Sequence, residues 1–375
     1  MRKQQRVNAP PLRDPEGNIL TDTQEKIQLL MHTHVRLENS EHLEPPLFPE
    51  VEDTWGPLTT EEVRTAINKA GDTTPGPDEV PNAALKLAWP HLGDAITTMY
   101  NLSLEWSIFP SIFKRATLCT VLKPGKRPKW NPKSYRLIAL LPTLGKGLER
   151  VIARRLAFEA IERGTIPHNY ICATPKRSAT DLILSLVDEI EDSLLNKKET
   201  VSLATFDVKR TFDAVNPTRM VQRLIDQGWP TKVCRWVQSF LDGRKANLTL
   251  DGQSGEVRPL SGSLPQGSPM SSILYMLFMA PLYSRGAHLR GYADDGIIKV
   301  TGRMPEDNVA PLQREFGAIQ EWCGRNGIEL DMGKAGLIHI TRKKTTDNPD
   351  IQLPDGSQLE ATKAKDSLRW LGVLR

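Results

Sequence analysis

The sequence contains little cysteine, and its four cysteines are widely separated. Cys119, Cys172, Cys234 and Cys323 form no CxxC pair and no short cysteine–histidine spacing. A structural zinc site needs such spacings, and a disulfide framework needs cysteines that can pair in an oxidising compartment. The pattern therefore argues against both and fits a chain in a reducing compartment.

Long hydrophobic runs are also missing. Residues 1–18 have no apolar core, so no secretory signal is predicted. The longest apolar run, residues 273–283, is shorter than the stretch of about 20 residues that a membrane-spanning helix needs. We therefore expect an intracellular chain with no membrane partner.

Positive charge is concentrated in one part of the chain. The 375 residues carry a formal net charge of +4, but the window from Lys114 to Arg155 holds twelve lysines or arginines and one acid, Glu149. That window carries +11, which leaves −7 for the rest (4 − 11). A basic block inside a foldable sequence is typical of a surface that binds polyanions. A solvated charged face is the alternative, but the interleaved Gly, Pro, Trp130 and Tyr135 favour the polyanion interpretation.

Hydrophobic periodicity predicts a mixture of helices and strands. Hydrophobic residues make up 39% of the chain and charged residues 25%, which is enough for a sizeable core. Helical patterns cover residues 21–38, 58–70, 83–107, 143–163, 181–198, 218–243 and 264–283, and strand patterns fall in 115–128, 201–207, 245–260 and 290–300. The order shows no regular βαβ alternation, so the predicted fold class is α+β. Residues 1–56 are expected to form one helix and a linker.

Two adjacent acids in the stretch RGYADDGIIKV, residues 290–300, suggest a metal site. Apolar flanks place Asp294 and Asp295 at the tip of a predicted hairpin whose strands hold Tyr292 and Ile297. Two ionised carboxylates so close are costly without a counter-charge, and Mg²⁺ takes oxygen ligands. Asp207 ends another β-rich run, TFDV, so three carboxylates converge if the two strands are neighbours. That arrangement suits two-metal phosphoryl or nucleotidyl transfer, although a lone DD is more often a surface turn.

An ordered set of motifs resembles a known family. The stretches FDVKRTFDAV, LPQGSPMSSILY, GYADDG and WLG, in this order, resemble the palm of reverse transcriptases. The upstream stretches TTPGPDEVPN, RATLCTVLKPGKRP and SYRLIALLPTLGKGLER narrow the resemblance to the polymerases of non-LTR (LINE-type) retrotransposons. The resemblance covers roughly residues 57–373. It implies a right-hand polymerase fold over 57–375 with an antiparallel palm sheet: mainly fingers over 57–200, mainly palm over 201–375, and the thumb largely absent.

The resemblance implies roles for individual residues. It implies two Mg²⁺ ions, with Mn²⁺ as a substitute. Their expected ligands are Asp207, Asp294, Asp295 and the backbone carbonyl of Val208. It gives nucleotide-binding roles to Lys123, Arg136, Phe212, Gln266, Gly267 and Lys334. The Phe212 ring would exclude a 2′-hydroxyl, and Gln266 and Gly267 would lie beside the nascent base pair. Lys123 and Arg136 would grip the triphosphate, as an ammonium point charge and a bidentate guanidinium. Lys334 would lie near the triphosphate, as a candidate general acid.

Several positions depart from the pattern of the family. Leu137 stands where proline is usual, Thr211 where a small alanine is usual, and Arg210 where glycine or lysine is common. Further departures are Thr174, Lys176 and the pair Ala335–Gly336. These changes spare the acids but touch expected nucleotide and template contacts. A catalytically inactive nucleic-acid-binding remnant is therefore the alternative to an active enzyme.

The resemblance also implies partners and a location. The expected function is RNA-directed DNA synthesis on an RNA template, from a DNA primer or target, with dNTPs. An RNA-dependent RNA polymerase is a further alternative, against which Phe212 argues. A group II intron maturase is a related enzyme within the reverse transcriptase hypothesis. The chain is expected to be a fragment that lacks the endonuclease and C-terminal regions of a longer element protein. The family implies a nuclear location, which the sequence itself does not show.

Overall fold

The structure is a computed structural model that describes residues 9–35, 43–125, 127–172, 177–260, 264–344, 347–362, 368 and 370–371. The chain forms two compact units that interleave in sequence. Unit 1 comprises Met1–Arg155 and Asn216–Ser271, and unit 2 comprises Leu156–Val215 and Ser272–Arg375. The expected division into fingers before residue 200 and palm after it stays a prediction. Of the departures from the family pattern, Thr174 and Lys176 lie outside the described residues.

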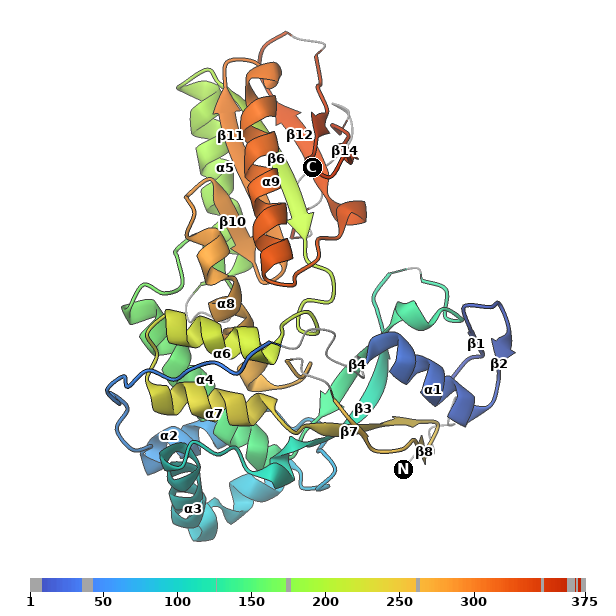
Figure 1. Ribbon diagram of the computed structural model, residues 1–375, viewed down its shortest axis with the longest axis vertical. Helices are drawn as coiled ribbons and strands as arrows, with labels where there is room; N and C mark the ends of the chain where they lie inside the picture. Colours follow the sequence, from blue (N-terminus) through green and yellow to red (C-terminus); the bar gives the residue numbers. More distant parts are fainter. Residues whose placement is uncertain are drawn as a thin grey trace. The chain divides into compact units, whose positions relative to one another are not determined.

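Unit 2 is built on a five-stranded sheet (Figure 1) in the order β12-β6-β11-β10-β5. The strands are β5 (Tyr170–Ile171), β6 (Thr200–Asp207), β10 (Leu289–Tyr292), β11 (Asp295–Gly302) and β12 (Gly336–Ile340). Neighbouring strands are antiparallel except β5 and β10, which run parallel. Every residue of β6 is buried, as expected for an apolar central strand.

Two helices cover opposite faces of this sheet. Helix α5 (Ala179–Leu195) packs its Leu186 in a cluster that includes Leu203 of β6. Helix α9 (Val309–Arg325) places Phe316 against Phe206 of β6, with ring centroids 6.4 Å apart. Because alternate residues of a strand point to opposite faces, α5 and α9 lie on the two sides of the sheet, as Figure 1 shows. Unit 2 also contains the short strands β13 (Ile351–Gln352) and β14 (Gln358–Leu359).

Unit 1 combines a second sheet with helices. Its sheet has the order β4-β3-β7-β8, and β9 pairs with β7. The strands are β3 (Arg115–Leu122), β4 (Tyr135–Leu140), β7 (Lys245–Leu250), β8 (Gln253–Ser254) and β9 (Arg258–Pro259), with a separate pair β1 (Leu12–Arg13) and β2 (Ile19–Leu20). The helices are α1 (Thr23–His34), α2 (Thr60–Asn68), α3 (Asn82–Glu105), α6 (Pro217–Asp226) and α7 (Thr231–Leu241). The chain passes between the units at three points: within α4 (Thr143–Glu162), just before α6, and within α8 (Pro269–Tyr283).

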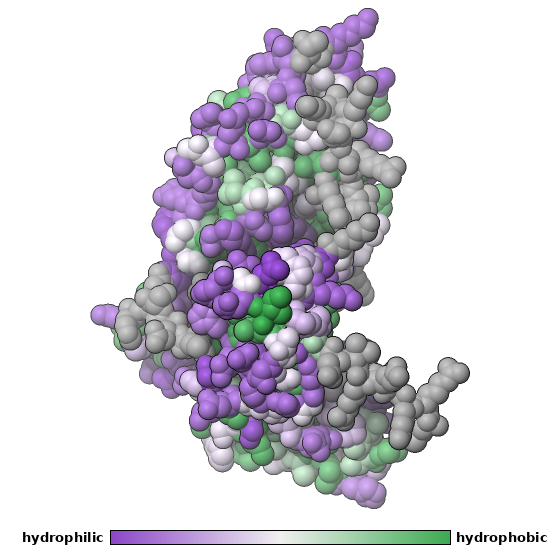
Figure 2. All heavy atoms as spheres, turned by 90° about the vertical axis from the view of Figure 1, so that its right-hand side faces the viewer, coloured by the Kyte–Doolittle hydropathy of each residue, from purple (hydrophilic) through white to green (hydrophobic). Residues whose placement is uncertain are grey.

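The observed elements confirm the predicted mixture of helices and mainly antiparallel strands. The strand predicted within 115–128 ends at Leu122, and the helix predicted over 21–38 covers Thr23–His34. None of the described helices is long and apolar enough to cross a membrane. Among the coloured residues of the face drawn in Figure 2, hydrophilic residues are spread widely and hydrophobic residues are interspersed among them.

The N-terminal helix is an integral part of unit 1. Ile27 and Leu30 of α1 belong to the same buried cluster as Leu118 of β3 and Leu248 of β7. The buried Lys26 ammonium pairs with the carboxylate of Asp251 at 3.2 Å. The segment before residue 57 therefore contributes core to unit 1, and the expected linker stays a prediction.

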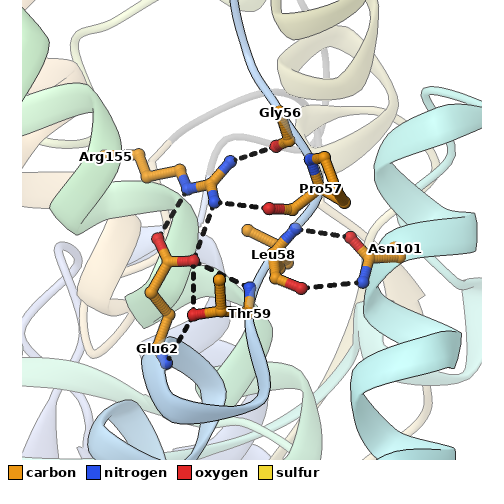
Figure 3. A network of polar contacts seen from close by, with 7 residues as sticks. All are labelled: Gly56, Pro57, Leu58, Thr59, Glu62, Asn101 and Arg155. Carbon is orange, nitrogen blue, oxygen red and sulfur yellow. Dashed lines mark hydrogen bonds and ion pairs between the residues drawn. The ribbon is translucent and has the colours of Figure 1, made fainter.

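A polar network connects the linker to helices of unit 1 (Figure 3). The Arg155 guanidinium binds both carboxylate oxygens of Glu62, each at 2.8 Å, and donates to the carbonyls of Gly56 and Pro57. Glu62 also completes a capping box with Thr59 at the start of α2. The hydrogen bonds from Arg155 lower the pKa of Glu62 to about 2, although burial opposes them. One side chain thus fixes the entry into α2.

Replacing Arg155 with alanine is expected to lower the free energy of unfolding by roughly 2–4 kcal/mol, because a partly buried carboxylate and two carbonyls lose a charged donor. Urea unfolding of the variant measures this loss. Arg154→Ala is the matched control, since Arg154 is the exposed neighbour on the same helix. Equal stabilities of the two variants would show that the network contributes nothing specific.

Candidate active site

The strand register brings two of the predicted acids together. Asp207 is the last residue of β6 and Asp295 the first of β11, and the two are directly opposed in the antiparallel pairing of these strands. Directly opposed side chains lie on the same face, with Cβ atoms about 4.5–5.5 Å apart. Asp207 is 6% exposed. The expectation that the strand ending in Asp207 neighbours the hairpin is therefore confirmed.

Asp294 lies next to this pair, in the turn of the β10–β11 hairpin. Tyr292 pairs with Asp295, so Ala293 and Asp294 form a two-residue tip. The Asp294 carboxylate accepts a hydrogen bond from the Thr211 hydroxyl at 2.7 Å. The sequence marked Thr211 only as a departure from the family pattern, and no local signal predicted this contact. A residue that replaces alanine thus orients one of the three acids.

The backbone of Val208 is directed toward the same side of β6 as the hairpin. Val208 and Leu330 form an antiparallel bridge in which the hydrogen bonds come from flanking residues: the Asp331 amide donates to the Asp207 carbonyl, and the Lys209 amide to the Glu329 carbonyl. In such a pair the carbonyl of the central residue points away from the partner strand. The Val208 carbonyl therefore faces the side on which β11 pairs.

Lys334 provides the counter-charge of the acids. Its ammonium binds the Asp207 carboxylate and lies 3.5 Å from the carboxylate of Asp331. Burial alone would lower the pKa of Lys334, but the hydrogen bond to Asp207 and the two carboxylate charges outweigh burial and raise it. The structure thus places Lys334 beside the predicted metal ligands. It also adds Asp331, which the sequence analysis did not single out.

The acids bear an electrostatic cost in this arrangement. Burial raises the pKa of Asp207, the Lys334 ammonium opposes this rise, and the charge of Asp294 adds to it. Burial, followed by the charges of Asp294 and Asp207, raises the pKa of Asp295 to about 6. Neighbouring carboxylates that resist ionisation together are a favourable setting for a divalent cation, which would relieve their repulsion.

The donor set fits a hard metal ion, although the described residues contain no ready-made cluster. No group of three or more His, Cys, Asp or Glu side chains in the described part of the chain is already arranged to hold a metal. The opposed Asp207 and Asp295, the adjacent Asp294 and the Val208 carbonyl nevertheless offer only oxygen ligands, which Mg²⁺ and Mn²⁺ accept.

Asp295 gives a testable dependence of stability on pH. Its folded pKa of about 6 lies above the ordinary value of 3.8, so the folded state holds this proton more tightly and loses stability as pH rises from about 4 to about 6. Asp295→Asn removes this loss. Without metal, the variant is expected to be more stable than the unchanged chain by roughly 1 kcal/mol at pH 7, allowing for partial solvent exposure, and equally stable near pH 4. Thermal unfolding at both pH values measures the difference, and a difference independent of pH would contradict the assignment.

Phe212 follows Asp207 along the chain and belongs to the same unit as the three acids. Its half-buried ring packs edge-to-face with the ring of Tyr275 of α8, with centroids 5.7 Å apart and an interplanar angle of 70°. This contact fixes the ring in the loop that leaves Asp207. Five of the predicted side chains and the Val208 carbonyl therefore belong to unit 2: Asp207, Phe212, Asp294, Asp295 and Lys334.

Gln266 and Gly267 form a turn at the start of α8 in unit 1. The Gln266 carbonyl accepts from the Ala139 amide of β4 at 2.7 Å. Gly267 has φ +122°, and a Cβ there would lie 2.6 Å from the Ala139 carbonyl oxygen. Only glycine fits this close approach to β4. The next residue, Ser268, donates to the buried carboxylate of Glu149.

Lys123 and Arg136 lie on the β3–β4 hairpin of unit 1. The Lys123 ammonium donates to the Lys133 carbonyl at 2.8 Å, and its amide donates to the Ser134 carbonyl. Arg136 is exposed on β4 opposite Val121. Unit 1 thus holds Lys123, Arg136, Gln266 and Gly267, and their roles toward a nucleotide stay predictions.

Comparison with known proteins gives a consistent result. The family described as reverse transcriptase (RNA-dependent DNA polymerase) matches residues 121–374. The RNA-directed DNA polymerase from mobile element jockey of Drosophila funebris is 27% identical over 328 residues, which cover 85% of this chain and 35% of that protein. The probable RNA-directed DNA polymerase from transposon X-element of Drosophila melanogaster is 25% identical, over 93% of this chain and 37% of that protein. The chain thus spans about a third of the length of these relatives.

Among solved structures, apo telomerase of Candida tropicalis, truncated from its C-terminal domain, is similar with a TM-score of 0.46 and 11% sequence identity. The similarity covers 70% of this chain and 59% of that chain.

Proposed function

Because the chain belongs to the reverse transcriptase (RNA-dependent DNA polymerase) family, we propose that it catalyses RNA-directed DNA synthesis, adding dNTPs to a primer 3′-hydroxyl on an RNA template. The expected relationship to polymerases of non-LTR retrotransposons is confirmed by the family match and the relatives. One observation carries the proposal: Asp207 and Asp295 are opposed on neighbouring strands, with Asp294 adjacent. In this proposal unit 2 is the palm of a right-hand polymerase.

The acids would hold two Mg²⁺ ions, with Mn²⁺ as a substitute. When bound, the ions supply activation of the primer hydroxyl and stabilisation of the departing pyrophosphate. The chain contributes three carboxylates and the Val208 carbonyl as ligands, and Thr211 keeps the Asp294 carboxylate oriented. Lys334 would leave Asp207 and place its ammonium near the triphosphate, as a candidate general acid.

The nucleotide roles complete the proposal. The Phe212 ring, held against Tyr275, would exclude the 2′-hydroxyl of a ribonucleotide. Lys123 and Arg136 would bind phosphates, and Gln266 and Gly267 would lie beside the nascent base pair. The partners are an RNA template, a DNA primer or target and dNTPs. The location is proposed to be the nucleus.

Primer extension tests the proposal directly. The purified chain is incubated with an RNA template, an annealed DNA primer, dNTPs and Mg²⁺, and the products are resolved by length. Mg²⁺-dependent extension that copies the RNA supports the proposal. Extension that needs rNTPs would indicate an RNA polymerase instead.

The alternative is an inactive nucleic-acid-binding remnant of such a polymerase. The departures from the family pattern at Leu137, Arg210 and Thr211 favour it. It predicts RNA binding that weakens steeply with salt, without any synthesis. Extension by the purified chain would exclude this alternative.

A further inference from the structure

The tip of the β10–β11 hairpin contains a strained residue. Ala293 has φ +54°, whereas Asp294 is not among the described non-glycine residues with positive φ. A two-residue hairpin turn with positive φ at its first position has the sign pattern of a type II′ turn, which favours glycine there. An alanine in this conformation persists only if its surroundings hold it.

Strand β5 supplies that support through two consecutive residues. The Ala293 amide donates to the Ile171 carbonyl at 3.2 Å, and the Tyr170 hydroxyl donates to the Ala293 carbonyl at 3.0 Å. Both polar backbone groups of Ala293 are therefore bound by β5. The hydrogen bond from the Ala293 amide goes to a backbone carbonyl. The hydrogen bond to the Ala293 carbonyl depends on the Tyr170 side chain.

The Tyr170 ring is itself fixed. Tyr170 is fully buried and stacks on Tyr283 of α8, with centroids 4.2 Å apart and an interplanar angle of 11°. Gly291 of β10 makes room for this stack, because a Cβ there would lie 2.2 Å from the Tyr283 ring. The side-chain amide of the neighbouring Asn169 donates to the Tyr283 carbonyl at 2.9 Å and to the Leu289 carbonyl at 2.7 Å. The hydroxyl thus has a defined position relative to the hairpin.

We propose that Tyr170 is a positioning residue for the polymerase reaction: its hydroxyl holds Ala293 in the left-handed conformation and so fixes where Asp294 and Asp295 present their carboxylates. This inference rests on the proposed function. Among the described residues no hydrogen bond joins the Tyr170 hydroxyl to a carboxylate, so Tyr170 acts through the backbone of the hairpin tip.

The chain offers a matched pair of variants. Tyr170→Phe removes the hydroxyl and keeps the stacked ring. Tyr283→Phe removes the hydroxyl of the other ring, which is buried and has no hydrogen-bond partner among the residues that the structure describes. The two variants lose the same atom from the same stack, so they differ only in the bond to Ala293.

Steady-state kinetics of primer extension give the first readout. Tyr170→Phe is expected to lower kcat about tenfold or more, and to raise the Mn²⁺ concentration needed for half-maximal rate, as loss of a group that orients metal ligands does. The KM for dNTP should change less than twofold. Tyr283→Phe should keep all three values within twofold. Equal kinetics of the two variants would overturn the proposal.

Hydrogen–deuterium exchange gives a second readout that does not require activity. Peptides covering residues 289–297 should exchange faster in Tyr170→Phe than in Tyr283→Phe, while the rest of unit 2 stays unchanged. Faster exchange throughout unit 2, with a lower Tm, would overturn a local role. If the unchanged chain fails to extend primers, the proposed function falls, and the exchange comparison alone decides whether Tyr170 holds the tip.

Discussion

Replacing Asp294 or Asp295 with asparagine is expected to lower the rate of primer extension at least about a thousandfold. Asparagine keeps the shape of the side chain but removes the charge that a metal site needs. A bound metal ion stabilises the charge of the transition state by several kcal/mol, and losing this stabilisation lowers the rate about a thousandfold. The same result is expected for Asp207→Asn, because Asp207 is the register partner of Asp295.

Asp331→Asn is the matched control for these variants. Asp331 is an acid that also lies near Lys334, but it is not part of the opposed pair or the hairpin tip. Its replacement is expected to change the rate of primer extension less than about tenfold. That is the lower end of the effect seen when a residue that contacts a metal ligand, but not the metal, is replaced. Extension by Asp294→Asn and Asp295→Asn at rates close to that of Asp331→Asn would contradict a metal-binding role for the pair.

Replacing Phe212 with valine is expected to raise the use of rNTPs relative to dNTPs by roughly a hundredfold, as the ratio of kcat/KM values. The ring lies in the loop after Asp207 and packs edge-to-face with the ring of Tyr275. A smaller side chain leaves room for a 2′-hydroxyl, and steric exclusion in a pocket gives selectivity of this order. Single-nucleotide incorporation with each class of nucleotide measures the ratio.

Tyr275→Phe controls for disturbance of the packing around Phe212. The variant keeps the ring that contacts Phe212 and removes a buried hydroxyl that has no hydrogen-bond partner within the described residues. Its nucleotide selectivity is expected to equal that of the unchanged chain. If Phe212→Val still incorporates dNTPs with unaltered nucleotide selectivity, the role of Phe212 in excluding the 2′-hydroxyl is contradicted.

The local elements of the site could be predicted from the sequence because their signals are local. An apolar run ending in Asp207 and a tight hairpin around Asp294 follow from the alternation of residues and from apolar flanks. The register that opposes Asp207 and Asp295 joins residues 88 positions apart (295 − 207) and has no local signal. The order of motifs in the resemblance supplied that expectation.

The contacts that the sequence could not predict are contacts between distant segments. The Thr211 hydroxyl binds the carboxylate of Asp294, 83 residues away. Asp331 joins the site through its amide, which donates to the carbonyl of the distant Asp207. Tyr170 precedes the tip that it contacts by 123 residues. The packing of α1 into the core of unit 1 was missed for the same reason, since the amphipathic pattern of a helix does not identify the surface that it meets.

Anomalous diffraction from crystals of the chain soaked with Mn²⁺ and a non-reactive dNTP analogue tests the central claim most directly. We predict two manganese peaks about 3.5–4 Å apart, bound by Asp207, Asp294 and Asp295, with the Lys334 ammonium no longer on Asp207. Manganese bound elsewhere, or no manganese on these carboxylates while Lys334 still pairs with Asp207, would contradict it.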